Sequence, residues 1–441
     1  MRERQQIAGA AADALEGLAR EGKFRPALIG FDGFIDAITE AVDTRHDMTP
    51  RGYTRMRTIT QFAARAAAAA GKSTNIELVV TEERFGGNGP LMAGALGRVG
   101  VPVTYVGGVG AGAGEGERRA ENGGKASPAL GSPLSLPLHP VFRPFARRCR
   151  AVYPICPPAH TDALEFDDGK IMFNRPANAQ AVTWERIVEV LGLDVLVRLV
   201  GEASLLGIVN WSLLGGVEGI WRGLMRDVLP RVQDARSKRV YIDLSDPAKR
   251  TDEDVRRAMG LLRELNEHVP VTLGLNLAEA ERMARVFGLG IREGGSGGAG
   301  FQPAAEVLGD LGMRVRRTEE EEDCGLKARL PGLKVLVPEL AAALRGSMRL
   351  DTIVVHPREG AAAASEDGAA WFDGPFTSTP RLSTGAGDHF NAGFALAQVH
   401  GLPLAQCLAV GCAVSGAYVR DAESPSLERL VGFMRSLPAA E

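Results

Sequence analysis

The residues best suited to chemistry lie in the segment Leu382–Phe394, which reads LSTGAGDHFNAGF. Its loop is made of small residues that let the backbone turn tightly, so that its N–H groups can converge on one point: Thr384, Gly385, Ala386 and Gly387. The apolar spacing that follows predicts a helix. A helix N-terminus offers unpaired N–H donors and about half a positive charge, so the segment has the pattern of an anion site.

Asp388 stands at the mouth of this predicted site. A carboxylate there can take a proton from an attacking hydroxyl while the N–H groups hold the charge of a phosphate. We therefore interpret Asp388 as the catalytic base of a kinase, with the backbone of Gly385, Ala386 and Gly387 as its anion hole. The alternative is a glycine turn that caps a helix, with the aspartate as an ordinary first-turn residue.

The composition is that of an ordinary globular protein, and the length, long for one domain, is compatible with one large α/β domain that carries insertions. The 441 residues are 45% hydrophobic and 24% charged, and 51 Lys and Arg stand against 54 Asp and Glu. The resulting net charge of −3 gives no general attraction to nucleic acid or to a membrane, and no apolar run is long enough to span one. Five cysteines without a C-x-x-C pair predict free thiols and a cytoplasmic protein.

Two acidic residues follow the first predicted strand. Residues 26–37 read PALIGFDGFIDA, an apolar run that ends in Asp32 and Asp36. Because ligands of parallel sheets bind beyond the carboxyl ends of the strands, both acids are placed to accept hydrogen bonds from substrate hydroxyls. For Asp32 the alternative is a cap on a turn.

A second glycine turn consists of Gly86, Gly87 and Asn88. Glycines there let the backbone approach a ligand closely, so these three residues are candidates for substrate binding. The residues after the turn, 91–99, predict a helix of small side chains that stops at Gly100.

Strands and helices alternate regularly in the second half of the chain, and one strand ends in Asp243. Asn276 and Glu279 then stand three residues apart where a strand becomes a helix, so both face the carboxyl edge of the sheet. An amide and a carboxylate there can order magnesium-bound water near phosphates. A capping Asn with a first-turn Glu explains the same spacing.

Two glycine-containing stretches do not fit nucleotide motifs. The run AAAAAGKST over residues 66–74 has Ala66 where a P-loop requires glycine. Residues 107–117 satisfy no register of G-x-G-x-x-G. The sequence therefore predicts neither a P-loop protein nor a dinucleotide-binding protein.

The remaining segments predict a lid and two insertions. An Asp-Gly turn inside Ala163–Phe173 predicts a hairpin, which together with a strand over Ile76–Arg84 indicates a small extra sheet. We place the lid segments at about 37–84 and 150–178. Residues 111–140 and 290–335 lack periodicity and contain glycine-rich runs, which is typical of insertions.

These motifs together resemble the ribokinase-like (PfkB) carbohydrate kinases over most of residues 25–430. The stretch STGAGD is similar to the family signature D-T-x-G-A-G-D, which implies that Asp388 is the base. Gly86, Gly87 and Asn88 match the turn that touches the sugar, and Asp36 matches the acid after the first strand. Asn276 and Glu279 match the family's N-x-x-E motif.

The resemblance implies a single domain over residues 1–441, folded as a three-layer α/β/α sandwich with a mainly parallel sheet and a small β lid. It implies transfer of the γ-phosphoryl group of ATP to a hydroxyl of a small sugar or polyol, with Mg²⁺ held through water at Glu279. It also implies a homodimer through the lid. The residues that it places on the nucleotide side are Asn276, Glu279, Thr384, Cys412 and Ser415.

Departures from the family pattern keep alternatives open. Leu382, Leu91 and Pro357 occupy places where the family usually has Asp, Asn and Gly. The stretches GFDGFIDAI and GLNLAEAE are also similar to the ADP-dependent sugar kinases, so ADP remains an alternative donor. A nucleoside kinase, with phenylalanines near the site, and a non-catalytic sugar- or nucleotide-sensing protein are the other two alternatives.

Overall fold

The computed structural model describes residues 2–112, 135–289 and 319–439. Its central layer is a sheet of nine strands in the order β14-β13-β12-β11-β10-β9-β1-β5-β6. The seven strands from β12 to β6 are parallel, and β13 and β14 extend the sheet as an antiparallel hairpin. The strands are Ala27–Phe31 (β1), Val103–Gly107 (β5), Ala151–Pro154 (β6), Leu205–Val209 (β9), Arg239–Asp243 (β10), Val271–Leu275 (β11), Thr352–Val355 (β12), Gly360–Ser365 (β13) and Gly368–Asp373 (β14).

The strands of this sheet are apolar because both of its faces are covered. In β1, Leu28 packs in one hydrophobic cluster while Ala27 and Ile29 pack in the other. In β12 the same alternation puts Ile353 in the first cluster and Val354 in the second. Two cores therefore lie on either side of the sheet.

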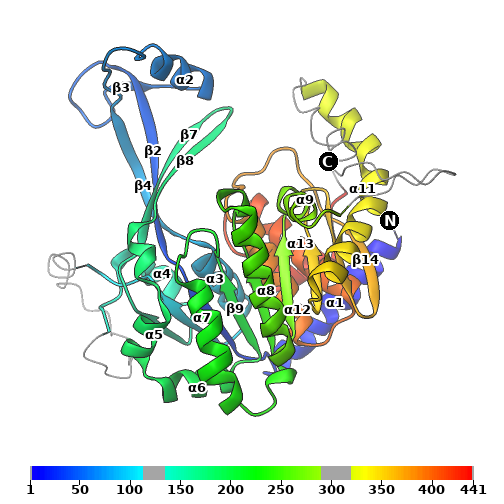
Figure 1. Cartoon of the computed structure of the whole chain (residues 1–441). Helices are drawn as coiled ribbons and strands as arrows, with labels where there is room; N and C mark the ends of the chain where they lie inside the picture. Colours follow the sequence, from blue (N-terminus) through cyan, green and yellow to red (C-terminus); the bar gives the residue numbers. More distant parts are fainter. Residues whose placement is uncertain (1, 113–134, 290–318, 440–441) are drawn as a thin grey trace.

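Helices form the two outer layers (Figure 1). The first core is closed by Trp184–Leu191 (α5), Leu193–Glu202 (α6), Val217–Gly223 (α7), Asp252–His268 (α8), Leu277–Val286 (α9) and Glu319–Met348 (α11). The second is closed by Arg2–Arg20 (α1), Asn88–Val99 (α3), Ala386–Val399 (α12), Leu404–Asp421 (α13) and Leu427–Arg435 (α14). The predicted three-layer sandwich is confirmed. Among the described residues, no helix has the length and apolar character to cross a membrane.

A second sheet projects from the sandwich as the predicted lid (Figure 1). Its order is β3-β2-β7-β8, with β4 paired to β2. The strands are Phe34–Arg45 (β2), Tyr53–Arg55 (β3), Leu78–Gly86 (β4), Ala159–Phe166 (β7) and Gly169–Arg175 (β8), and Ile59–Ala67 (α2) packs near the tip. The predicted hairpin is confirmed as β7–β8. The second lid segment starts later than predicted, because residues 151–154 form β6 of the central sheet.

Three other segments stand out in the sequence. The strand predicted at the start of residues 26–37 is β1, and Asp32 and Gly33 separate it from β2, which belongs to the lid sheet and carries Asp36. The P-loop-like residues 66–74 are the end of α2 and the turns after it, as the rejection of that motif requires. The predicted insertion at 290–335 lies partly outside the described residues, and its last part belongs to α11.

Helices α12 and α13 approach closely through glycines. A Cβ added at Gly393 would lie 2.8 Å from the carbonyl oxygen of Val410 and 3.0 Å from the Cα of Gly411. Real Cβ atoms do not come that close to backbone, so the two helices would have to separate. This contact fixes the helix that carries Asp388 against the second core.

We expect Gly393→Ala to lower the free energy of unfolding by about 1–3 kcal/mol, the usual cost of overpacking. Gly260→Ala on α8 is the matched control, because nothing lies within 4 Å of a Cβ there and helix propensity favours alanine. Urea denaturation followed by circular dichroism measures both. Equal stability of the two variants would contradict the close packing.

Candidate active site

The TGAGD loop forms the N-terminus of α12, as predicted. Gly385 is its N-cap, with φ at +89°, a conformation that favours glycine. The Tyr418 hydroxyl donates to the carbonyl of Thr384 at 2.7 Å, and Nδ1 of His389 donates to the carbonyl of Gly385 at 2.7 Å. These two bonds hold the loop from behind. Within the loop, the Ala386 N–H donates to the Ser383 carbonyl at 3.2 Å.

His389 is a structural residue next to the predicted base. It is fully buried, stacks on Tyr418 with 3.6 Å between ring centroids, and its Nε2 lies 2.9 Å from the Ser424 hydroxyl. Burial lowers its pKa to about 4, so the ring is neutral at physiological pH. A neutral ring can donate to the Gly385 carbonyl through one nitrogen and accept from Ser424 through the other.

Asp388 lies in the first turn of α12, 8% exposed, and accepts a hydrogen bond from Asn88 Nδ2 at 2.9 Å. The structure thus joins the predicted base to the predicted substrate-side turn across 300 residues of sequence. Burial raises the pKa of Asp388 well above its ordinary value, and the charge of Asp243 adds to this. The bond from Asn88 favours the carboxylate and acts in the opposite direction.

Asp32 caps the helix that begins with Asn88. Its carboxylate is fully buried and accepts from the backbone N–H groups of Asn88 and Gly89 at 2.9 and 2.8 Å. The Asn210 amide, which follows β9, donates to it at 2.8 Å. The structure therefore shows the capping role, and a contact between Asp32 and a substrate hydroxyl stays a prediction.

The pKa of Asp32 rises to about 6, because burial outweighs its three hydrogen bonds. The oxygen of the same Asn210 amide, Oδ1, is buried without a hydrogen-bond partner among the described residues. Asn210 was not predicted from the sequence, because no sequence pattern marks it. Its φ of +67° is a conformation that asparagine tolerates.

Asp36 lies at the base of the lid. It stands in register with Arg84 of β4 and Thr161 of β7. A Cβ at Gly86 would overlap its carboxylate, which explains the first glycine of the G-G turn. Burial raises the pKa of Asp36, while nearby Arg84 and Lys170 lower it. The cations on this face of the lid were missed, because only the pairing of three separated strands brings them together.

Asn276 and Glu279 form a capping box at the start of α9. Glu279 N–H donates to Asn276 Oδ1 at 3.0 Å, and Asn276 N–H donates to Glu279 Oε2 at 2.9 Å. Burial and the nearby charge of Asp243 raise the pKa of Glu279 to about 9. The capping interpretation is thus shown, and a role toward magnesium stays a prediction.

Asp243, at the end of β10, was identified only as the end of a strand. It is buried and accepts from Asn391 Nδ2 at 2.5 Å and from Ser245 N–H at 2.6 Å. Burial raises its pKa. Its charge raises the pKa values of both Glu279 and Asp388, so the three acids share one site.

The other residues predicted on the nucleotide side lie in different surroundings. Thr384 is in the loop, and its hydroxyl is buried without a partner among the described residues. Cys412 is 6% exposed in the second core, where burial raises its pKa to about 12, and Ser415 is half-buried on α13. Cys149, Cys156, Cys407 and Cys412 are free thiols, as predicted.

The side chains of Leu91 and His356 lie close to the glycines of the loop. A Cβ at Gly385 would lie 3.1 Å from Leu91, which stands where the family has asparagine. His356 follows β12, packs against Phe390 with tilted rings at 4.7 Å between centroids, and would lie 3.5 Å from a Cβ at Gly387. Burial lowers the pKa of His356 to about 4, so it adds no charge beside the predicted anion hole.

The sequence is similar to characterised sugar kinases over nearly its full length. A family model described as prokaryotic ketohexokinase matches residues 5–135, 125–319 and 335–436. A ketohexokinase of Haloferax volcanii is 28% identical over 408 residues, which cover 92% of this chain and 90% of that protein.

Solved structures show the same fold. A carbohydrate kinase from Agrobacterium tumefaciens superposes with a TM-score of 0.54 at 15% identity, covering 94% of this chain and 98% of that one. Arabidopsis thaliana ribokinase, complexed with ribose and ATP, gives a TM-score of 0.52 at 14% identity, with 93% and 98% covered. The chain therefore belongs to the prokaryotic ketohexokinase family and is a sugar kinase with the ribokinase-like (PfkB) fold.

Proposed function

We propose that the protein transfers the γ-phosphoryl group of ATP to a hydroxyl of a ketohexose, with Asp388 as the general base. The observation that carries this proposal is the 2.9 Å hydrogen bond from Asn88 to Asp388. This bond places the G-G turn, which carries Asn88, directly beside Asp388 at the N-terminus of α12. The name of the Haloferax relative supplies the substrate class.

The chain's own residues account for the steps of the reaction. Asp36 and the turn at Gly86 and Gly87 bind the sugar hydroxyls below the lid. Asp388 accepts the proton of the attacking hydroxyl, and the N–H groups of the first turn of α12 stabilise charge on the transferred phosphoryl group. The lid excludes water, so that ATP is not lost to hydrolysis.

The acids beside the loop fit a magnesium ion. Asp243 is buried and Glu279 is half-buried, their charges repel each other, and a bound cation would relieve that cost. The described residues contain no group of three or more His, Cys, Asp or Glu that could enclose a metal. Magnesium suits this arrangement because it keeps several waters and takes one or two carboxylates plus phosphates. When bound, it would neutralise phosphate charge.

A nucleoside as acceptor has less support. The phenylalanines near the site that could stack on a base are occupied in the core: Phe31 and Phe34 are 6% and 3% exposed. Phe85 packs against Phe145 at 5.8 Å between ring centroids. ADP as donor remains the alternative for the nucleotide, and a cytoplasmic location agrees with the free thiols.

The lid also supports a homodimer in which two lids pair. Exposed apolar side chains occur on both its edge strands, with Val80 of β4 at 53% and Phe173 of β8 at 46%. Apolar residues exposed on edge strands are typical of surfaces that pair with a second chain.

The first experiment is a phosphotransfer assay with fructose and excess Mg²⁺, using ATP or ADP. We expect wild-type protein to use ATP, and Asp388→Asn to lose at least about 10²-fold in kcat, because the base is removed while its shape is kept. Asp367→Asn, in the exposed β13–β14 turn, is the matched control and should keep full activity. Near-normal turnover in Asp388→Asn would refute the assignment of the base.

The pH profile tests the environment of the base. A base works deprotonated, so its raised pKa should move the acidic limb of kcat/KM well above the ordinary aspartate value. Asn88→Leu removes the hydrogen bond that favours the carboxylate, so we expect the limb to move to still higher pH. A limb that stays in place, or moves to lower pH, would contradict this arrangement.

Sugar binding is tested at Asp36. Asp36→Ala should raise KM for the sugar at least about tenfold, because a charged hydrogen-bonding group is lost, while KM for ATP stays within about twofold. Asp162→Ala is the control. Asp162 lies on the same lid, but it forms an ion pair with Arg175, whose side chain is 62% exposed. Equal effects on both KM values would show that Asp36 only supports the lid.

A further inference from the structure

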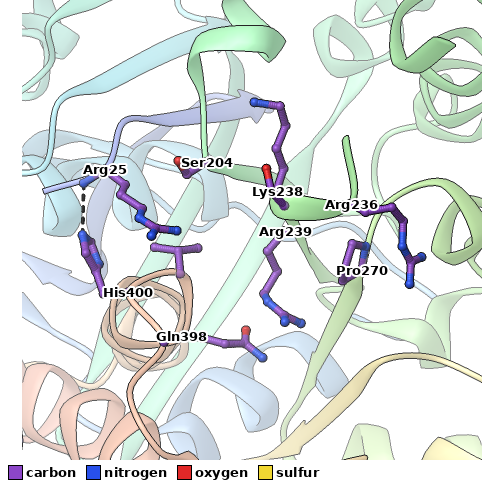
Figure 2. A pocket seen from close by; sticks show the side chains of 11 residues that line it. Arg25, Ser204, Arg236, Lys238, Arg239, Pro270, Gln398 and His400 are labelled. Atoms are coloured by element: carbon purple, nitrogen blue, oxygen red, sulfur yellow. Dashed lines mark hydrogen bonds between the residues drawn. The ribbon is translucent and has the colours of Figure 1, made fainter. Parts of the chain in front are cut away.

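A basic hollow lies at the edge of the central sheet opposite the active site. Its volume is about 240 Å³. The hollow lies where the strands of the sheet begin (Figure 2). Its lining includes Arg25 before β1, Ser204 before β9, Arg239 at the start of β10 and His400 after α12. Asp32 and Asp243, by contrast, stand where strands end. The hollow is thus separate from the kinase site.

Positive charge in this hollow is poorly neutralised. Its lining includes Arg25, Arg236, Lys238 and Arg239 and no carboxylate. Lys238 Nζ donates to the carbonyls of Gly201 and Ala203, and Arg236 donates to the carbonyl of Asn266, which are neutral partners. Only Arg239 pairs with an acid there, Asp351, which does not line the hollow.

Two donors in the lining are available to a ligand. The guanidinium of Arg25 and the hydroxyl of Ser204 have no hydrogen-bond or ion-pair partner in the part of the chain that the structure describes. His400 is committed instead: its Nε2 accepts from Arg25 N–H at 3.0 Å, and its Nδ1 donates to the Leu396 carbonyl at 2.8 Å. The imidazole is therefore a neutral wall beside the two donors.

We infer that this hollow binds the phosphate group of a small molecule. Arg25 and Ser204 line the hollow from separate segments, and arginine and hydroxyl donors are groups that recognise phosphate oxygens. The volume of about 240 Å³ is enough for a phosphate with a few attached atoms. A neighbouring hollow of about 400 Å³ shares Arg236 and is lined by Arg345 and Arg349 together with Asp351 and Glu366, so it carries both signs of charge, unlike the basic hollow.

Two histidines allow this site and the active site to be observed separately. His400 lines the hollow, while His356 lies beside Gly387 in the anion loop. Full-length protein with ¹³C-labelled histidine Cε1 is titrated with inorganic phosphate at constant pH and ionic strength, and His400→Asn and His356→Asn assign the signals. We expect a saturable shift of the His400 signal, whatever the His356 signal does.

Charge variants decide whether the binding is specific. Arg25→Gln should raise the half-saturating phosphate concentration for His400 at least about tenfold, because a charge-assisted hydrogen bond is lost. Arg198→Gln removes the same charge from an exposed position on nearby α6 that does not line the hollow, and should change it less than twofold. Thermal unfolding confirms that both variants are folded.

Three outcomes would overturn the inference. The first is a His400 shift that is absent or does not saturate. The second is an equal effect of Arg25→Gln and Arg198→Gln, which would indicate a general electrostatic response. The third comes from titrations with a hexose phosphate, a short oligonucleotide and a phosphoinositide vesicle. If the oligonucleotide or the vesicle shifts the His400 signal at a lower concentration than the hexose phosphate, the ligand of the hollow is a polymer or a membrane and not a small molecule. Loss of kinase activity in Asp388→Asn affects none of these readouts.

Discussion

The buried carboxylate of Asp32 is the contact on which the site depends. It ends the first strand of the central sheet and caps the first turn of α3, and Asn210 reaches it from β9. Removing a hydrogen-bond donor from a fully buried carboxylate lowers the stability of the fold, because the desolvation penalty of the acid is then no longer compensated. The cap therefore fixes where α3 begins, and with it the position of Asn88 opposite Asp388.

Several acids share the region around the anion loop, and this arrangement has an electrostatic consequence. Burial raises the pKa values of Asp32, Asp243, Glu279 and Asp388, and the charge of Asp243 adds to the rise for the other three. Several acids placed together in this way lower the stability of the fold, a cost that proteins commonly carry at sites where chemistry requires it. The amide groups of Asn88 and Asn391, each bonded to one acid, compensate part of this cost.

Motifs with a local physical cause could be predicted from the sequence. Four such features depend on neighbouring residues, and the structure contains all of them: the TGAGD helix, the G-G turn, the capping spacing of Asn276 and Glu279, and the alternation of strands and helices. Contacts between distant segments could not be predicted. Asn210, Arg84 and the bond between Asn88 and Asp388 depend on strand order and register, which no local pattern specifies.

The way the lid is attached has a mechanical consequence. β2 begins at Phe34, two residues after Asp32, and β4 ends at Gly86, two residues before Asn88. Both connections of this half of the lid therefore run into the cap that positions Asn88 beside Asp388. A rotation of the lid over a sugar would apply torque to these two short connections and reach Asn88 directly. For Asp388 as the proposed base, such a lever would make its orientation depend on whether the acceptor site is filled, and so link phosphoryl transfer to the presence of its acceptor.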